Sequence, residues 1–82
     1  MNFGEALSEL KKGNKAARAG WNGKGMYLFY SPSGVAAGRE EGQPVLHPLR
    51  EFVVMKTAQG DFVPWLASQT DVLANDWTIV EG

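Results

Sequence analysis

Two segments of the sequence carry side chains suited to binding a ligand. Residues 18–25 contain two cations, an indole ring and an amide, which are Arg18, Lys24, Trp21 and Asn22. Three glycines in this segment let a ligand approach the backbone closely. A π-face, cations and N–H donors are the groups that bind the base and phosphates of a nucleotide. The alternative is a plain hairpin tip with Trp21 packed on a sheet.

The second segment, residues 64–71, places polar side chains at the start of an expected short helix. Ser68 is expected to cap this helix, and Gln69, Thr70 and Asp71 follow it. Free N–H groups at a helix start attract anions, and the side chains can contact a sugar or a base edge. The alternative is a capped helix with no ligand, beside a core that contains Trp65 and Trp77.

Catalytic and metal-binding constellations are absent from the sequence. The chain has no Cys and a single His, His47, which excludes thiolate and multi-histidine metal sites, and we expect no cofactor. The two glycine-rich phosphate-binding motifs, G-x-G-x-x-G and G-x-x-x-x-G-K-[ST], do not occur. The G-x-S-x-G nucleophile motif is also missing. A carboxylate pair could be built from Asp61, Asp71 and Asp76, but Asp71 already has a capping role. We therefore expect a protein that is not an enzyme.

Charge and hydropathy limit the partners. The net charge of −1 provides no basic excess for binding a nucleic acid polymer. No apolar run approaches the roughly 20 residues that cross a bilayer. The N-terminus has no basic region followed by an apolar stretch. We expect a cytoplasmic protein that binds neither nucleic acid polymers nor membranes.

The length of 82 residues indicates one domain over residues 1–82. A chain this short buries only about 60% of its unfolded surface, yet 44% of its residues are hydrophobic and 11% aromatic. Because disulfides and metals are excluded, oligomerisation is the remaining way to stabilise it. Tyr27, Phe29 and Tyr30 fit sheet packing or a subunit interface better than ligand contact.

The periodicity predicts an α+β fold, in which an N-terminal helix and a short C-terminal helix pack on a mostly antiparallel sheet. The first helix is expected over residues 3–12, with Asn2 and Glu5 as a capping box. Strands are expected at 14–19 and 26–30, which form a hairpin, and at 49–56, 61–65 and 77–80. The short helix is expected at 69–74. Pro64 belongs at a sheet edge or a strand end.

Residues 31–48 have low apolar content and no periodicity. They hold three of the four prolines, three glycines and an acidic pair. We expect a long surface loop here. Loops of this length in small domains are usually functional or mobile.

Four segments resemble the second class of Thoeris anti-defence (Tad) proteins, a small phage and bacterial family that was formerly a domain of unknown function. These segments are NFGEAL (2–7), ARAGWNGKGM (17–26), MKTA (55–58) and VPWLASQTDVLANDW (63–77). The resemblance extends over nearly the whole chain except residues 31–48. The last segment is long and framed by tryptophans, so it is the most specific.

The resemblance implies a non-catalytic sponge. Members of this family bind the cyclic ADP-ribose isomer made by the Thoeris defence and sequester it intact, so the downstream effector stays inactive. They form homotetramers with ligand pockets between subunits, and some also bind cyclic oligonucleotides at separate sites. A phage-encoded member would act in the cytoplasm of the bacterial host.

The resemblance also implies roles for the two segments. Trp21 would stack on a base, Asn22 would contact base or ribose, and Arg18 and Lys24 would contact the pyrophosphate. The same pocket would be lined from its own or a neighbouring subunit by Ser68, Gln69, Thr70 and Asp71. Two alternatives stay open, which are a nucleotide-processing enzyme and a structural or protein-interaction module.

Overall fold

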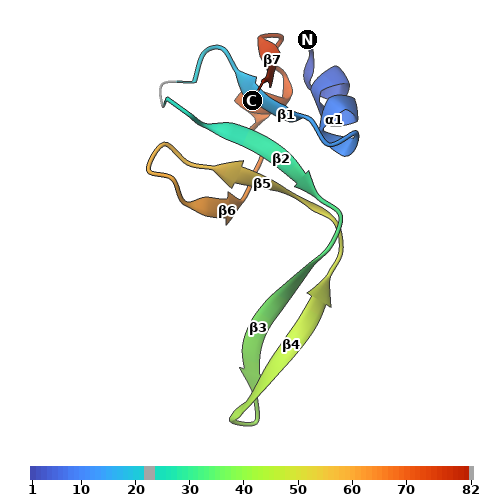
Figure 1. Ribbon diagram of the computed structural model, residues 1–82, viewed down its shortest axis with the longest axis vertical. Helices are drawn as coiled ribbons and strands as arrows, with labels where there is room; N and C mark the ends of the chain where they lie inside the picture. The colour runs from blue at the N-terminus through green and yellow to red at the C-terminus, as the bar shows by residue number, and fades with distance from the viewer. Residues whose placement is uncertain (22–23, 82) are drawn as a thin grey trace.

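The computed structural model has a helix on one face of a five-stranded sheet and a two-stranded arm that extends away from it (Figure 1). It describes residues 1–21 and 24–81. The helices are α1 (Phe3–Lys11) and α2 (Gln69–Val72). The strands are β1 (Lys15–Arg18), β2 (Tyr27–Ser31), β3 (Gly34–Glu40), β4 (Gln43–Leu49), β5 (Phe52–Lys56), β6 (Phe62–Pro64) and β7 (Trp77–Val80). The expected α+β class is confirmed.

Helix α1 begins at the capping box that the sequence predicts. The Asn2 side chain accepts from the Glu5 N–H at 2.8 Å, and the Glu5 carboxylate accepts from the Asn2 N–H at 3.0 Å. Ala6 and Leu10, on the inner face of the helix, are fully buried. Gly13 follows with a φ of 100°, a conformation that favours glycine and ends the helix.

The five-stranded sheet has the order β6-β5-β2-β1-β7, and all its pairs are antiparallel. The expected hairpin of β1 and β2 is confirmed, with Ala16 opposite Leu28. Strand β6 lies at one edge and contains Pro64, as predicted. Strand β7 forms the other edge and pairs with β1 so that Trp77 lies opposite Arg18.

The core lies between α1 and the sheet. Its fully buried members are Ala6, Leu10, Ala16, Leu28 and Trp77. The Trp77 ring contacts three other aromatic rings, those of Phe3, Trp21 and Trp65, at centroid distances of 5.3, 5.4 and 6.0 Å. Trp77 is therefore the central core residue, as expected from its place at the start of an apolar strand.

The expected loop at residues 31–48 is wrong, because most of this stretch forms a β-hairpin. Strands β3 and β4 pair antiparallel around Glu41 and Gly42, whose φ values of 50° and 80° fit a two-residue hairpin turn. Pro44 and Pro48 lie opposite Arg39 and Val35, at positions of β4 where the backbone N–H would point away from β3. Because no hydrogen bond between the strands is lost there, proline is tolerated at both positions. We call residues 34–49 the arm.

The arm meets the sheet through a close contact at Gly34. A Cβ at this position would lie 2.8 Å from Cε1 of Phe52, which is too close for any side chain without movement. The absence of a side chain thus lets the root of β3 pack against the first residue of β5.

In the described ranges, 1–21 and 24–81, neither helix has the length and apolar composition of a membrane span. The same ranges contain no group of three or more His, Cys, Asp or Glu side chains arranged to hold a metal.

We predict that Trp77→Ala lowers the free energy of unfolding by about 3–5 kcal/mol, because it removes a buried ring and leaves a cavity. Urea denaturation at fixed protein concentration, followed by far-UV circular dichroism, measures this. The matched control is Leu66→Ala, since Leu66 is 91% exposed and its truncation should change stability by less than about 0.5 kcal/mol. Equal effects of the two variants would contradict the central place of Trp77.

Candidate functional site

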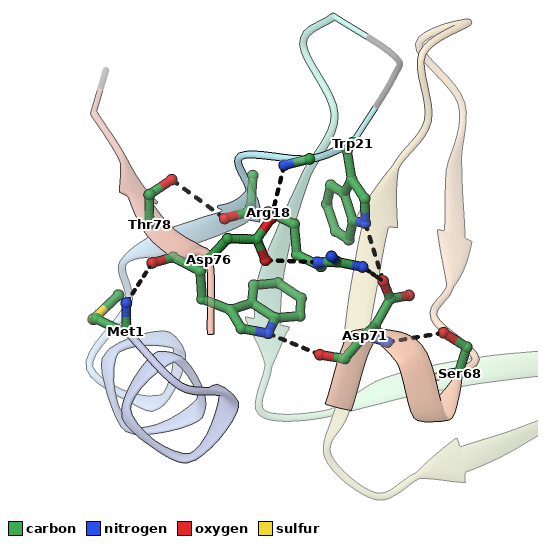
Figure 2. Close-up of polar contacts among 10 residues, drawn as sticks. Met1, Arg18, Trp21, Ser68, Asp71, Asp76 and Thr78 are labelled. Atoms are coloured by element: carbon green, nitrogen blue, oxygen red, sulfur yellow. Dashed lines mark hydrogen bonds and ion pairs between the residues drawn. The ribbon is translucent and has the colours of Figure 1, made fainter. Parts of the chain in front are cut away.

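The candidate site is organised around Arg18, at the end of β1. Its Nη1 donates to Oδ1 of Asp71 and its Nε donates to Oδ1 of Asp76, both at 2.8 Å (Figure 2). The side chains of Arg18 and Asp71 are each 18% exposed, so both ions are largely removed from water. One guanidinium thereby joins the end of β1, helix α2 and the segment before β7.

Trp21 is fixed by the same carboxylate. Its Nε1 donates to Oδ1 of Asp71 at 3.2 Å, so this oxygen accepts from both Trp21 and Arg18. The indole ring meets Trp77 edge to face, with the two planes at 79°. Trp21 is half-buried. A hydrogen bond and a ring contact together define the plane of the indole and leave part of it at the surface.

Asp76 fixes the start of the glycine-rich segment. Its Oδ2 accepts from the Gly20 N–H at 2.9 Å, and its backbone carbonyl accepts from the Ala19 N–H at 3.0 Å. Asp76 was not among the expected binding residues. Only the register of β1 against β7 brings it to Arg18, and no local pattern in the sequence indicates that register.

Helix α2 begins at Ser68, as predicted. The Ser68 hydroxyl oxygen accepts from the Asp71 N–H at 3.1 Å. The Asp71 carbonyl in turn accepts from Nε1 of Trp77 at 2.9 Å, which ties α2 to the core. Asp71 is therefore both a helix residue with a structural role and the centre of the polar cluster.

The structure brings together four of the expected site residues, which are Arg18, Trp21, Ser68 and Asp71 (Figure 2). Gln69 and Thr70 are exposed on the first turn of α2. Lys24 is exposed in the turn before β2. Asn22 lies outside the described residues. We name Arg18, Trp21, Asp71 and Asp76 the Arg18 cluster.

The Arg18 cluster carries more negative than positive charge. One positive and two negative side chains give it a formal charge of −1. The hydrogen bonds that Arg18 donates to Asp76 and, to a smaller extent, to Asp71 raise the pKa of Arg18. Desolvation acts to raise the pKa of Asp71, but hydrogen bonds from Arg18 and Trp21 outweigh it and the pKa is lowered. Arg18 and the Gly20 N–H lower the pKa of Asp76.

A second feature, an open groove of about 590 Å³, lies at the root of the arm. Its lining is apolar apart from Arg50, and it includes Val35, Phe52, Phe62 and Val63. None of the expected site residues that the structure describes lines it. Sequence patterns could not indicate this groove, because it exists only where the arm joins the sheet.

Comparison with known proteins assigns the family. The chain belongs to the Thoeris anti-defense 2-like domain family, whose model matches residues 1–80. It is also 45% identical over 84 residues to "Thoeris anti-defense 2" of Bacillus phage SP01, an alignment that covers 98% of this chain and 94% of the relative. The family expected from the four segments is confirmed, and the match includes the arm. Membership supports an anti-defence role.

Acid should destabilise the protein through Asp71 and Asp76. Their folded-state pKa values lie below the ordinary 3.8, so the unfolded chain takes up protons first as the pH falls. The stability that they contribute is full well above pH 3.8 and is lost as the pH falls through their lowered values. We expect a level melting temperature from pH 7 to about 5 and a decline below about pH 4.

The variant Asp71→Asn/Asp76→Asn should melt at lower temperature at pH 7 and show a shallower acid decline than the natural protein. Asp61→Asn, which changes a carboxylate outside the cluster, is the control and should keep the full decline. Parallel acid profiles for the double variant and the natural protein would show that the cluster does not produce this dependence.

Proposed function

We propose that the protein is a non-catalytic sponge, which binds a cyclic ADP-ribose-type signalling nucleotide and holds it intact, so that bacterial anti-phage defence is blocked. The observation that carries this proposal is the near full-length match to Thoeris anti-defense 2. The Arg18 cluster supports it, because its polar groups are engaged in fixing one another and Trp21. Such an arrangement suits a rigid binding surface better than proton or group transfer.

Trp21 is the proposed stacking surface for a base. The bond to Asp71 and the perpendicular contact with Trp77 hold the ring in one plane, so little side-chain freedom is lost when a base stacks on it. Asn22 follows directly in the chain and is the proposed partner for base or ribose. Asp71 has a second carboxylate oxygen, Oδ2, that can accept from ribose hydroxyls.

Of the two expected pyrophosphate contacts, Arg18 and Lys24, the proposal keeps Lys24. Two N–H groups of Arg18 already donate to carboxylates, and the two carboxylates repel an added anion. Lys24 is exposed three residues after Trp21 and adds a positive charge to the same segment. Ser68, Gln69 and Thr70 at the start of α2 complete the proposed pocket with their hydroxyl and amide groups.

The proposed working form is a homo-oligomer, which the resemblance to the family indicates is a tetramer. It is proposed to act in the cytoplasm of a bacterial host. In this assembly the pocket lies between subunits. Cyclic oligonucleotides are proposed as a second ligand class, bound at a separate site.

The decisive experiment combines binding with recovery of the ligand. The full-length protein is mixed with a cyclic ADP-ribose isomer, and the melting temperature of the protein is measured. The ligand is then released by heat, and its mass is measured by mass spectrometry. A ligand at 100 times its dissociation constant should add about 2.7 kcal/mol of stability. An unchanged ligand mass is expected. A cleaved or rearranged product would establish an enzyme instead, and the absence of any nucleotide-induced shift would favour a protein-interaction module.

Trp21→Ala should weaken nucleotide binding about 5- to 150-fold, because base stacking on an aromatic ring contributes about 1–3 kcal/mol. Trp21→Phe, which keeps a ring but loses the N–H bond to Asp71, should fall between Trp21→Ala and the natural protein. Isothermal titration measures all three proteins. Leu73→Ala, which truncates a 74% exposed side chain beside α2, is the control and should bind normally. Normal affinity in Trp21→Ala would exclude Trp21 from the site.

A further inference from the structure

Asp76 holds the chain that leaves β1 through both its side chain and its backbone. Its Oδ2 accepts from the Gly20 N–H at 2.9 Å, and its carbonyl oxygen accepts from the Ala19 N–H at 3.0 Å. Its Oδ1 accepts from Nε of Arg18 at 2.8 Å, and Figure 2 shows the carboxylate lying between Arg18 and the chain that leads to Trp21. One residue therefore binds each of the three residues that precede Trp21.

The position of Trp21 depends on these three residues. The Trp21 N–H donates to the Arg18 carbonyl oxygen at 3.2 Å, which closes a four-residue turn that we call the 18–21 turn. The backbone of the last residue in such a turn is set by the residues before it, and the indole leaves the chain from that backbone. Asp76 thus acts on Trp21 through the turn, whereas Asp71 contacts the indole itself.

Gly20 lies directly against the Asp76 carboxylate. A Cβ atom at position 20 would lie 3.0 Å from Oδ2 of Asp76, which is closer than ordinary van der Waals contact. The φ of Gly20 is outside the left-handed region, in contrast to that of Gly25 at 75°, so the backbone does not demand glycine at position 20. The absence of a side chain there instead lets the carboxylate approach the Gly20 N–H.

The charge of Asp76 opposes the ligand that the proposed function assigns to this site. A pyrophosphate is anionic, and a second carboxylate beside Arg18 repels it. The Asp76 side chain is 35% exposed, so water and salt screen this repulsion only in part. Attraction for the ligand therefore does not account for a carboxylate at this position, whereas its hydrogen bonds to Gly20 and Arg18 do.

We propose that Asp76 is a positioning residue of the nucleotide site, which holds the 18–21 turn so that Trp21 is in its binding orientation before the nucleotide arrives. This inference rests on the proposed function and adds to it a residue that acts on the ligand through Trp21. A ring that is fixed beforehand loses little freedom on binding. Ordering a mobile side chain at a binding surface reduces affinity about 2- to 13-fold, which is the effect expected when the turn is released.

The first test needs no nucleotide and measures hydrogen exchange of the ligand-free, full-length protein by NMR. Asp76→Ala should remove the protection of the Gly20 N–H and reduce that of the Trp21 indole N–H, because the 18–21 turn is released. The Trp77 indole N–H, which donates to a carbonyl of α2, is the internal reference and should keep its protection. Asp61→Ala, which truncates an exposed carboxylate outside the turn, is the matched control. Unchanged exchange at Gly20 and Trp21 would overturn the positioning role.

The second test measures the affinity of the same proteins for a cyclic ADP-ribose isomer by isothermal titration. Asp76→Ala should weaken binding about 2- to 13-fold, whereas removal of a repelling charge alone would strengthen it, so the sign of the change separates the two roles. Asp61→Ala should bind normally. Unchanged or tighter binding by Asp76→Ala would overturn the proposal. If the natural protein does not bind this nucleotide, the proposed function fails, and the exchange test alone decides whether Asp76 positions Trp21.

The third test combines substitutions in the same titration. Gly20→Ala keeps every side chain of the Arg18 cluster and should also weaken binding, because its methyl group displaces the turn from Asp76. The same substitution should cost little affinity in the Asp76→Ala protein, where the opposing oxygen is gone, and Asp76→Ala should cost little in the Trp21→Ala protein. Additive losses in both pairs would contradict an action through Trp21. If Asp76→Ala fails to fold by far-UV circular dichroism, Gly20→Ala alone tests the contact, and its normal affinity would overturn the proposal.

Discussion

The ion pairs of Arg18 are the interaction on which the rest of the site depends. Asp71 and Asp76 are 53 and 58 residues away in sequence, and the guanidinium holds them at 2.8 Å. Without a cation between them, these carboxylates would repel each other and lose their strongest donors. Through Asp71 the pairs orient Trp21, and through Asp76 they anchor Gly20. A single side chain thus converts three neighbouring segments into one rigid surface.

Much of the fold could be predicted because its signals are local. The capping box at Asn2 and Glu5 and the cap at Ser68 each involve residues three apart, and the structure confirms both. The arm could not be predicted, because Pro44 and Pro48 indicate a break in regular structure when they are considered singly. Both prolines occupy positions of β4 that donate no hydrogen bond to β3, so neither interrupts the hairpin. These positions can be recognised only once the pairing of β3 with β4 is known.

The residue types of the candidate site can be read from the sequence, but the hydrogen-bond partners of those residues cannot. Cations, an indole ring and helix-start groups suit a nucleotide, and the structure brings together Arg18, Trp21, Ser68 and Asp71. The family resemblance predicts that Arg18 contacts a phosphate, and in the structure its guanidinium donates to two carboxylates. That outcome follows from the pairing of Arg18 with Trp77 across β1 and β7, a contact between the two ends of the chain.

The close packing of Gly34 on Phe52 restricts the direction in which the arm leaves the sheet. The direction of the arm at this point is set by one hydrogen atom in place of a methyl group. Displacement grows with distance from a pivot, and the tip lies about 24 Å from the root. A small rotation of the arm about residue 34 would therefore displace Glu41 more than any residue near the root. A side chain at position 34 would therefore be felt most at the tip of the arm, because Phe52 or the root of the arm would have to move to admit it.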